Sequence, residues 1–343
     1  TALCDTDPAK IAPVAARLGA VRTTSDLGEI VGDDDVDVVS LCTPPYLHLE
    51  QATAVLEGGQ HVVCEKPLVG SLRDLDQLVA VQAAQQDRVV GDGLGPPRLM
   101  PVFQYRYGRG LQKLRALVDA GLTGELFTAS MEVAWQRGAD YYAVPWRGRW
   151  ATELGGTLFS HCVHGLDMAT YVTRPVAGDV ARVFARVATR VNAIETDDTV
   201  SASAELTGGG YLTLSATLGS IGEISRHRFC FRGLTAESND AAYTSSSDPW
   251  TFTAADPGAQ AVVDAVLAAV DARGEPESYQ RQFELFHAAI TSGAALPVTL
   301  DDARRSLELV TAMYASSAAG RQVELPLPPD HPFRAGWRPE GRP

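Results

Sequence analysis

A lysine directly follows one of the apolar runs in the first third of the chain. Residues 61–64 read His-Val-Val-Cys, which is typical of a buried strand, and Glu65-Lys66-Pro67 come next. A lysine that is partly removed from water has a lowered pKa, so it is able to donate or accept a proton near neutrality. The alternative is an exposed ion pair between Glu65 and Lys66, which would contribute little to stability.

A second candidate for proton chemistry is the segment 155–167, in which two histidines and an acid follow a pair of glycines. His161, His164 and Asp167 lie three residues apart, so on one helix they would share a face. An acid one turn from a histidine fixes the imidazole tautomer, which favours acid–base catalysis. Two alternatives stay open. One is a metal site, which ligands from a single helix rarely complete. The other is a capped helix whose polar groups are all satisfied.

The third candidate segment, residues 42–48, reads Cys-Thr-Pro-Pro-Tyr-Leu-His and follows another apolar run. A rigid turn at the carboxyl end of a parallel strand is where open α/β sheets bind their ligands. A plain proline-rich loop would have the same composition.

Alternating strands and helices are expected to position these segments. In the first 90 residues, apolar runs at 1–5, 36–42 and 61–64 alternate with helical patterns at 8–19, 49–56 and 72–86. This alternation predicts βαβ units and a parallel sheet that is covered on both faces.

The pattern changes after about residue 103. Residues 199–206 and 212–218 alternate apolar and polar side chains around three glycines, which predicts an antiparallel hairpin with one wet face. Further strands are expected at 180–191 and 229–231, and helices at 259–270, 280–290 and 300–317. The turn-rich segment 91–97 is expected to be a loop or linker between the two regions.

Composition excludes several classes of protein. The 29 basic and 42 acidic residues give a net charge of −13, which opposes binding to nucleic acid or to an anionic membrane. The five cysteines include no C-x-x-C pair, which argues against a disulfide framework or a zinc ribbon. No apolar stretch is long enough to span a membrane, so a cytoplasmic protein is expected.

Taken together, these motifs resemble one family, the glucose–fructose oxidoreductase, inositol dehydrogenase and rhizopine-catabolism (Gfo/Idh/MocA) oxidoreductases. The resemblance rests on the 42–48 turn, on Glu65-Lys66-Pro67, on the glycine pair followed by His164 and Asp167, and on the start of the late helix at residues 298–304. It implies an α/β fold in two parts. Residues 1–103 would form a Rossmann-type dinucleotide-binding domain with a parallel sheet whose first βα unit is missing. Residues 104–343 would form an α+β domain with a large, open, mostly antiparallel sheet.

The resemblance also implies a function, namely hydride transfer between a nicotinamide cofactor and a hydroxyl or keto carbon of a sugar, an inositol or a related polyol. Lys66 and His164 match the family's catalytic pair, with His164 as the acid–base, and Asp167, Ser160 and His161 would support them. Asp5 matches the acid that binds the adenosine ribose, which favours NAD over NADP because the acid would repel a 2′-phosphate. The expected cofactor-binding residues are Asp5, Cys42, Thr43, Pro44, His48, Glu65, Lys66 and Pro67.

Two departures from the family pattern stand out. Ser160 occupies a position where many members carry an Asp, so the proton relay is expected to differ or to run through substrate or water. No G-x-G-x-x-G loop precedes the first strand, although such loops hold the pyrophosphate. We therefore expect that about 25–30 native residues are missing from the front of this sequence. The alternative is a natural variant that has lost cofactor binding and acts as a binding or assembly protein.

Substrate contacts are expected from Lys66 and His164 and from aromatic and basic residues that suit sugar rings and anionic groups. These are Arg106, Tyr142, Trp146 and Arg147. An amphipathic loop packed on the sheet would explain the segment 141–150 equally well. The antiparallel sheet is expected to expose an apolar face and to bury it in a homodimer or homotetramer. No metal ion is expected.

Overall fold

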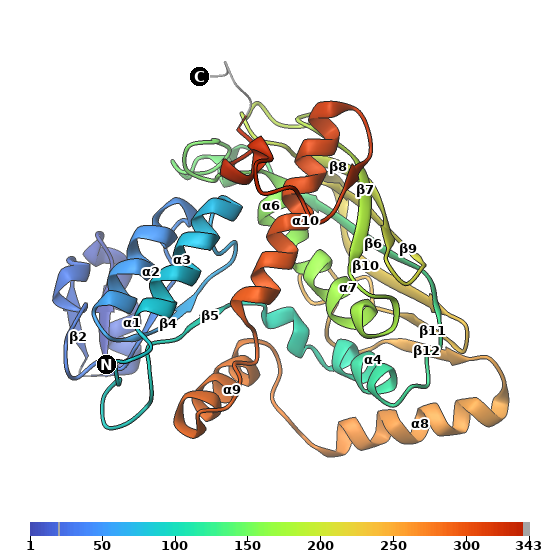
Figure 1. Cartoon of the computed structure of the whole chain (residues 1–343), viewed down its shortest axis with the longest axis horizontal. Coiled ribbons are helices and arrows are strands. Elements are labelled where there is room, and N and C mark those ends of the chain that lie inside the picture. Colours follow the sequence, from blue (N-terminus) through green and yellow to red (C-terminus); the bar gives the residue numbers. More distant parts are fainter. Residues whose placement is uncertain (20, 339–343) are drawn as a thin grey trace.

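In a computed structural model of the chain, which describes residues 1–19 and 21–338, the N-terminal third contains two parallel sheets (Figure 1). The first pairs β1 (Ala2–Cys4) with β2 (Arg22–Thr24), and the second has the order β3 (Val38–Leu41), β4 (His61–Cys64), β5 (Leu99–Pro101). The accompanying helices are α1 (Pro8–Leu18), α2 (His48–Glu57) and α3 (Leu72–Ala84), with short 3-10 turns η1 (Leu27–Glu29) and η2 (Pro45–Leu47). The βαβ prediction is confirmed.

Local sequence explains where these elements begin. The Asp7 carboxylate accepts a hydrogen bond from the Ala9 backbone amide and caps α1, and the Ser71 hydroxyl accepts one from the Asp74 amide and caps α3. All four residues of β4 are buried, as expected of a strand that is covered on both faces.

The register of β3 and β4 brings two of the candidate segments together. Leu41 pairs with Cys64, so both strands end at the same edge of the sheet. The segment 42–48 and the residues Glu65, Lys66 and Pro67 therefore leave this edge side by side.

The C-terminal region is built on an eight-stranded sheet with the order β12-β11-β10-β6-β9-β8-β7-β13. All neighbouring strands are antiparallel except β6 and β9, which run parallel. The strands are β6 (Leu126–Gln136), β7 (Val180–Ala188), β8 (Thr199–Leu206), β9 (Tyr211–Thr217), β10 (Gly219–Phe231), β11 (Leu234–Glu237), β12 (Thr251–Ala254) and β13 (Val323–Glu324). The predicted hairpin is confirmed as the antiparallel pair β8 and β9.

Helices cover one face of this sheet, with α7 packed on β6 and α10 packed on β7 (Figure 1). The helical elements are η3 (Gln104–Tyr107), α4 (Arg109–Asp119), α5 (Ala139–Tyr142), α6 (Thr157–Ser160), α7 (Cys162–Ala177), α8 (Pro257–Ala272), α9 (Ser278–Ser292), α10 (Leu300–Ala319) and η4 (Pro332–Ala335). The three late helices agree with the sequence prediction. None of the described helices combines the length and apolar character that a membrane span requires.

The prediction of an exposed apolar sheet face is wrong. The row that crosses the outer face reads Arg186, Ser201, Ser215, Glu132 and Arg226, and the neighbouring row contains Phe184, Ser203, Thr213, Ser130 and Arg228. Small hydroxyl side chains and charges thus occupy most of the solvent-facing positions, because the apolar half of each alternating strand points toward α7 and α10.

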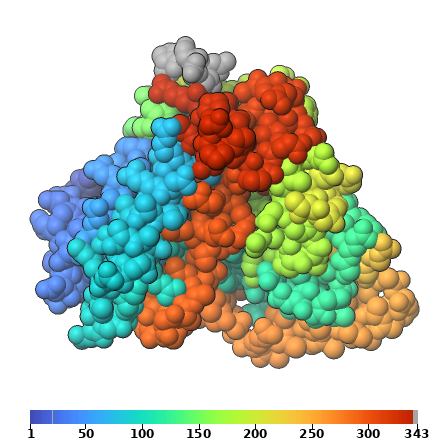
Figure 2. Space-filling view, in the orientation of Figure 1, coloured from blue at the N-terminus to red at the C-terminus, as the bar shows by residue number. Residues whose placement is uncertain are grey.

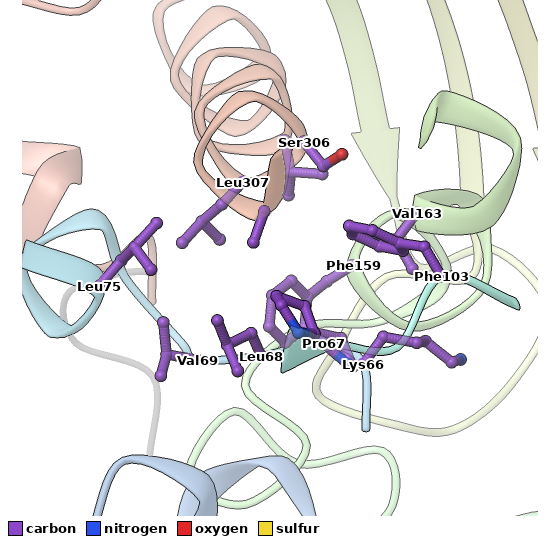
Figure 3. A pocket seen from close by; sticks show the side chains of 13 residues that line it. Lys66, Pro67, Leu68, Val69, Leu75, Phe103, Phe159, Val163, Ser306 and Leu307 are labelled. Carbon is purple, nitrogen blue, oxygen red and sulfur yellow. The ribbon is translucent and has the colours of Figure 1, made fainter. Parts of the chain in front are cut away.

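Helix α10 joins the two parts of the molecule. It packs on α3 of the first region as well as on β7 of the large sheet, and it fills the seam between them in the space-filling view (Figure 2). A small apolar cavity at this seam is lined by Leu68, Val69 and Leu75 from one side and by Ser306 and Leu307 of α10 from the other (Figure 3).

Candidate active site

A hydrogen bond between two distant segments defines the centre of the site. The Lys66 Nζ donates to the Ser160 carbonyl oxygen at 2.8 Å. The backbone of Lys66 borders the apolar cavity, but its side chain runs away from Val69 and Leu75 (Figure 3). The loop after β4 thereby contacts the segment between the glycine pair and α7.

The histidines flank this contact, although they do not share one helix as predicted. Helix α6 ends at Ser160 and α7 begins at Cys162, and His161 lies between them with a φ of −109°. The His161 ring lies edge-on to Trp135, and its Nε2 is 3.2 Å from the Tyr141 hydroxyl. The His164 ring instead stacks on Tyr105, with ring centroids 4.3 Å apart. The break gives the two imidazoles different neighbours.

Burial and charge keep both histidines neutral. Removal from water lowers the pKa of His161 and of His164 well below the ordinary value, and the positive charge of Lys66 lowers both further. The Nδ1 atoms of both rings are buried without a hydrogen-bond partner in the described structure. A buried polar atom that lacks a partner calls for an explanation, and an absent ligand is one.

The pKa of the Lys66 amine is lowered toward the neutral range. Burial lowers its pKa from 10.5 to about 8, and Arg147 lowers it as well, while Glu65 and Glu153 act in the opposite direction. Lys66 therefore remains charged at pH 7 but titrates within the range where enzymes work.

Asp167 does not serve the histidines. Its carboxylate accepts hydrogen bonds from Arg106 Nε at 2.8 Å and from Arg106 Nη2 at 2.6 Å, and Asp302 lies 3.3 Å from the same Nη2. This geometry pairs Asp167 with Arg106 instead of with a histidine, while the role of Arg106 as a substrate contact stays a prediction. Within the described residues, no group of three or more His, Cys, Asp or Glu side chains is arranged to hold a metal ion.

The segment 42–48 is tied to the loop that carries Lys66. The His48 ring nitrogens lie 2.8 Å from the Thr43 carbonyl oxygen and 2.9 Å from that of Pro67, so this buried imidazole joins the two strand exits. The Thr43 hydroxyl donates to Gln51 at 2.6 Å. Cys42 is exposed and Pro44 is half-buried at the same edge.

Glu65 and Asp5 sit at two strand ends. Glu65 accepts a hydrogen bond from the Tyr279 hydroxyl at 2.8 Å. Asp5 follows β1, where its carboxylate accepts the Asp7 amide at 2.9 Å and lies 3.6 Å from the Lys10 Nζ. The Asp5 carboxylate is partly exposed and retains lone pairs for further donors.

The aromatic segment 141–150 does reach the site. The Arg147 guanidinium lies over the rings of Tyr141 and Trp146, with its carbon 4.0 and 4.2 Å from the two ring centroids, and it donates to the Tyr141 hydroxyl. Tyr142 packs edge-on against Tyr141. The segment thus links Arg147 to His161 through a single hydroxyl.

Four residues of this neighbourhood carried no sequence signal that singled them out. Tyr105 lies on η3, Trp135 and Arg137 lie at the end of β6, and Glu153 precedes the glycine pair. Arg137 donates to Glu223 at 3.1 Å and to the Tyr243 hydroxyl at 2.9 Å. Their roles come from contacts between distant segments, so no local sequence signal could have found them.

Comparisons with known proteins agree with this architecture. A model described as an oxidoreductase family with an NAD-binding Rossmann fold matches residues 1–92, and the GFO/IDH/MocA C-terminal domain matches residues 111–236. The two matches together place the chain in an oxidoreductase family with a dinucleotide-binding fold. The chain belongs to the Gfo/Idh/MocA family.

Two curated relatives show the breadth of that family. Levoglucosan dehydrogenase of Pseudarthrobacter phenanthrenivorans is 29% identical over 171 residues, which are 50% of this chain and 41% of that protein. Myo-inositol 2-dehydrogenase of Thermotoga maritima is 27% identical over 187 residues, which are 54% of this chain and 49% of that protein. The chain therefore matches about half the length, or less, of these relatives.

Solved structures match over a longer span. The WlbA dehydrogenase from Bordetella pertussis, solved in complex with NADH and UDP-GlcNAcA, superposes with a TM-score of 0.78 at 24% identity. The match covers 96% of this chain and 90% of that one, which establishes a common fold.

Proposed function

We propose that this chain is an NAD-dependent oxidoreductase that transfers a hydride between nicotinamide and a hydroxyl or keto carbon of a sugar, an inositol or a related polyol. The observation that carries the proposal is the Lys66–Ser160 hydrogen bond, because it holds a charged amine of lowered pKa near two neutral imidazoles at the carboxyl edge of a parallel sheet. The dehydrogenase relatives, which act on levoglucosan and myo-inositol by name, support a polyhydroxylated substrate.

Residues at the strand ends of the first region would suit a dinucleotide. The loops after β3 and β4 carry the 42–48 turn and Lys66, the loop after β1 in the two-stranded sheet carries Asp5, and open α/β sheets bind nucleotides beyond such strand ends. Asp5 would bind the ribose hydroxyls and favour NAD over NADP, and Thr43, Pro44 and His48 would border the cofactor. When bound, the nicotinamide ring supplies the hydride acceptor or donor.

The side chains of this chain would handle the accompanying proton. His164 would take the hydroxyl proton in the oxidative direction, because burial keeps its imidazole unprotonated and able to accept one. The charged Lys66 would hold the substrate oxygen and stabilise negative charge that develops on it. Stacking on Tyr105 fixes the plane of the His164 ring. Tyr142, Trp146 and Arg147 would contact the rest of the substrate, whereas the role of Arg106, whose guanidinium is paired with Asp167, stays a prediction.

The test is a fluorescence titration with NADH and with NADPH, followed by turnover on a panel of sugars and inositols with NAD⁺. We expect NADH to bind at micromolar concentration and NADPH more weakly. His164→Asn and Lys66→Met should each reduce turnover about 10²–10⁴-fold. The matched control is His287→Asn, which replaces an exposed histidine on α9. Full activity in both site variants would contradict the assignment.

The remaining features of the proposal are a cytoplasmic location and a homodimer or homotetramer formed through the large sheet. Because the outer face is rich in Ser, Thr and Arg, such an interface would be polar and hydrated. Light scattering that gives the mass of a single chain would exclude the oligomer.

A further inference from the structure

The Lys66–histidine centre contains three cationic side chains, namely Lys66, Arg137 and Arg147, whose charges all act on His161. The acid nearest to the histidines in the sequence, Asp167, is occupied by Arg106. Glu65, next to Lys66, accepts the Tyr279 hydroxyl. Glu65 still acts on Lys66 more strongly than any other acid, and a second, more deeply buried carboxylate adds to its charge.

Glu153 is that carboxylate. It is only 1% exposed, and it precedes the glycine pair on the loop that leads into α6. Its Oε1 accepts the Ser160 hydroxyl at 3.4 Å and lies 3.6 Å from the Arg147 Nη1, while its Oε2 accepts the Gly148 backbone amide. A buried carboxylate with these donors is held in one place.

Ser160 connects Glu153 to the lysine. Its carbonyl oxygen accepts the Lys66 Nζ at 2.8 Å, and its hydroxyl donates to Glu153. Ser160 thus contacts the Lys66 amine through its carbonyl oxygen and the Glu153 carboxylate through its hydroxyl. A rotation of the Ser160 segment would disturb both contacts together.

We propose that Glu153 is a positioning residue for this centre: a buried carboxylate that holds the Ser160 acceptor of Lys66 in place through the Ser160 hydroxyl and adds its negative charge to that of Glu65. The proposal rests on the proposed function for its catalytic meaning, but its physical content concerns only residues of this chain. Arg147 is the cation that faces Glu153 directly, which ties the carboxylate to the aromatic segment.

The charges that face these groups set the sign of the effect. The charges of Glu65, Arg147 and Glu153 act on the Lys66 amine. The charges of Arg147 and Asp197 act on Glu153, which also accepts hydrogen bonds from the Gly148 amide and the Ser160 hydroxyl. Tyr141 and Tyr142 also lie within the field of Glu153. Removing the negative charge of Glu153 must lower the pKa of Lys66 below its value of about 8.

The chain has three lysines, Lys10, Lys66 and Lys113, so the effect is measurable directly. Protein labelled with ¹³C at lysine Cε should give three titrating signals by NMR, of which Lys66→Met identifies one. In Glu153→Gln, which keeps the size of the side chain, the Lys66 midpoint should fall by about 0.5 pH unit, because Glu153 is the weaker of the two acids that act on it. Lys10 and Lys113 serve as internal references. Glu153→Asp, which keeps the negative charge, should bring the Lys66 midpoint part of the way back to its value in the unmodified chain.

The matched control is Glu223→Gln, which removes the carboxylate partner of Arg137 in the same neighbourhood. It should leave the Lys66 midpoint where it is in the unmodified chain. If Glu153→Gln does not fold, Ser160→Ala takes its place, since it removes the hydroxyl link and keeps the carbonyl; it should shift the midpoint downward by a smaller amount.

A Lys66 midpoint that is the same in folded Glu153→Gln, or in Ser160→Ala, as in the unmodified chain would overturn the proposal. The proposal would also be overturned if Glu223→Gln shifted the Lys66 midpoint as much as Glu153→Gln does. The measurement needs neither substrate nor cofactor. Failure of the proposed function would instead appear as absent NADH binding by the unmodified chain, so the two failures are distinguishable. In the active enzyme, the limb of the pH–rate profile that belongs to Lys66 should move in the same direction.

Discussion

Arg106 and Asp167 form a buried ion pair one helical turn from His164. Both side chains are almost fully removed from water, and Asp302 supplies a second acid to the same guanidinium. Breaking one half of such a pair leaves an unpaired buried charge, whereas replacing both halves with apolar side chains removes the penalty. The pair is a means of fixing α7 and of keeping its histidine in place.

At this scale we predict that Arg106→Leu lowers the free energy of unfolding by about 3–5 kcal/mol. The double variant Arg106→Leu/Asp167→Leu should regain much of that loss and keep its substrate KM. Urea unfolding and steady-state kinetics provide the two measurements. A double variant that is stable but has a much higher substrate KM would indicate that Arg106 contacts the substrate.

Sequence reasoning identified Lys66, His161 and His164 because each follows a recognisable local signal, a strand end or a glycine pair. It did not identify Glu153 or Tyr105 as site residues, because their importance comes from contacts with Ser160 and His164 that no spacing reveals. It could not name Arg106 as the partner of Asp167 for the same reason. Spacing along a helix shows which residues are neighbours, but not which cation arrives from another element.

At the scale of elements, the junction between α6 and α7 depends on a residue far along the chain. The buried Asp197 carboxylate accepts the Gly156 and Leu158 amides at 2.9 and 2.8 Å and the Tyr314 hydroxyl at 2.5 Å. It thereby caps α6 from outside the helix. Gly156 is required at this place because a Cβ there would lie 1.8 Å from the Asp197 carbonyl oxygen.

We therefore predict that Gly156→Ala destabilises the protein by about 3 kcal/mol, near the upper end of the usual cost of overpacking, since the clash is with backbone. Gly138→Ala is the matched control, because Gly138 caps the nearby α5 with a φ of −121° and open space around its Cβ position. Thermal unfolding of both variants measures the difference. Equal thermal unfolding midpoints for the two variants would show that the junction between α6 and α7 accommodates the added methyl group without loss of stability.

The regular elements were predictable because their signals are local, and the β8–β9 hairpin is the clearest example. The parallel pairing of β6 with β9 was not, since the two strands are distant in the chain and nothing in either sequence names its partner. The helix break at His161 was hidden because His-Cys-Val-His is compatible with an unbroken helix. Tertiary contacts with Trp135 and Tyr141 decided it.

For the whole molecule, five of the seven histidines are buried, namely His48, His61, His161, His164 and His227. Burial lowers the pKa of every one of them, to about 4 for His61 and His227. In the unfolded chain these groups bind protons near pH 6.5, but in the folded protein they do so only at much lower pH. Stability must therefore rise with pH across this window and fall as the solution is acidified.

The prediction is a marked loss of stability between pH 7 and pH 5. A single histidine with a pKa of about 4 contributes about 2 kcal/mol to that loss. Urea midpoints at the two pH values measure it, and His227→Gln should reduce the difference while replacement of the exposed His287 should not. A stability that is flat over this range would contradict the burial of these rings.

The place of α10 in the fold has a consequence for the order in which the protein is made. Leu68, Val69 and Leu75 leave the ribosome well before the side chains that close over them, Ser306 and Leu307 among them. Until then the first region presents these apolar side chains to water or to a chaperone. Its folding is therefore completed only when α10 has been synthesised, so premature termination before α10 would leave both halves unfinished.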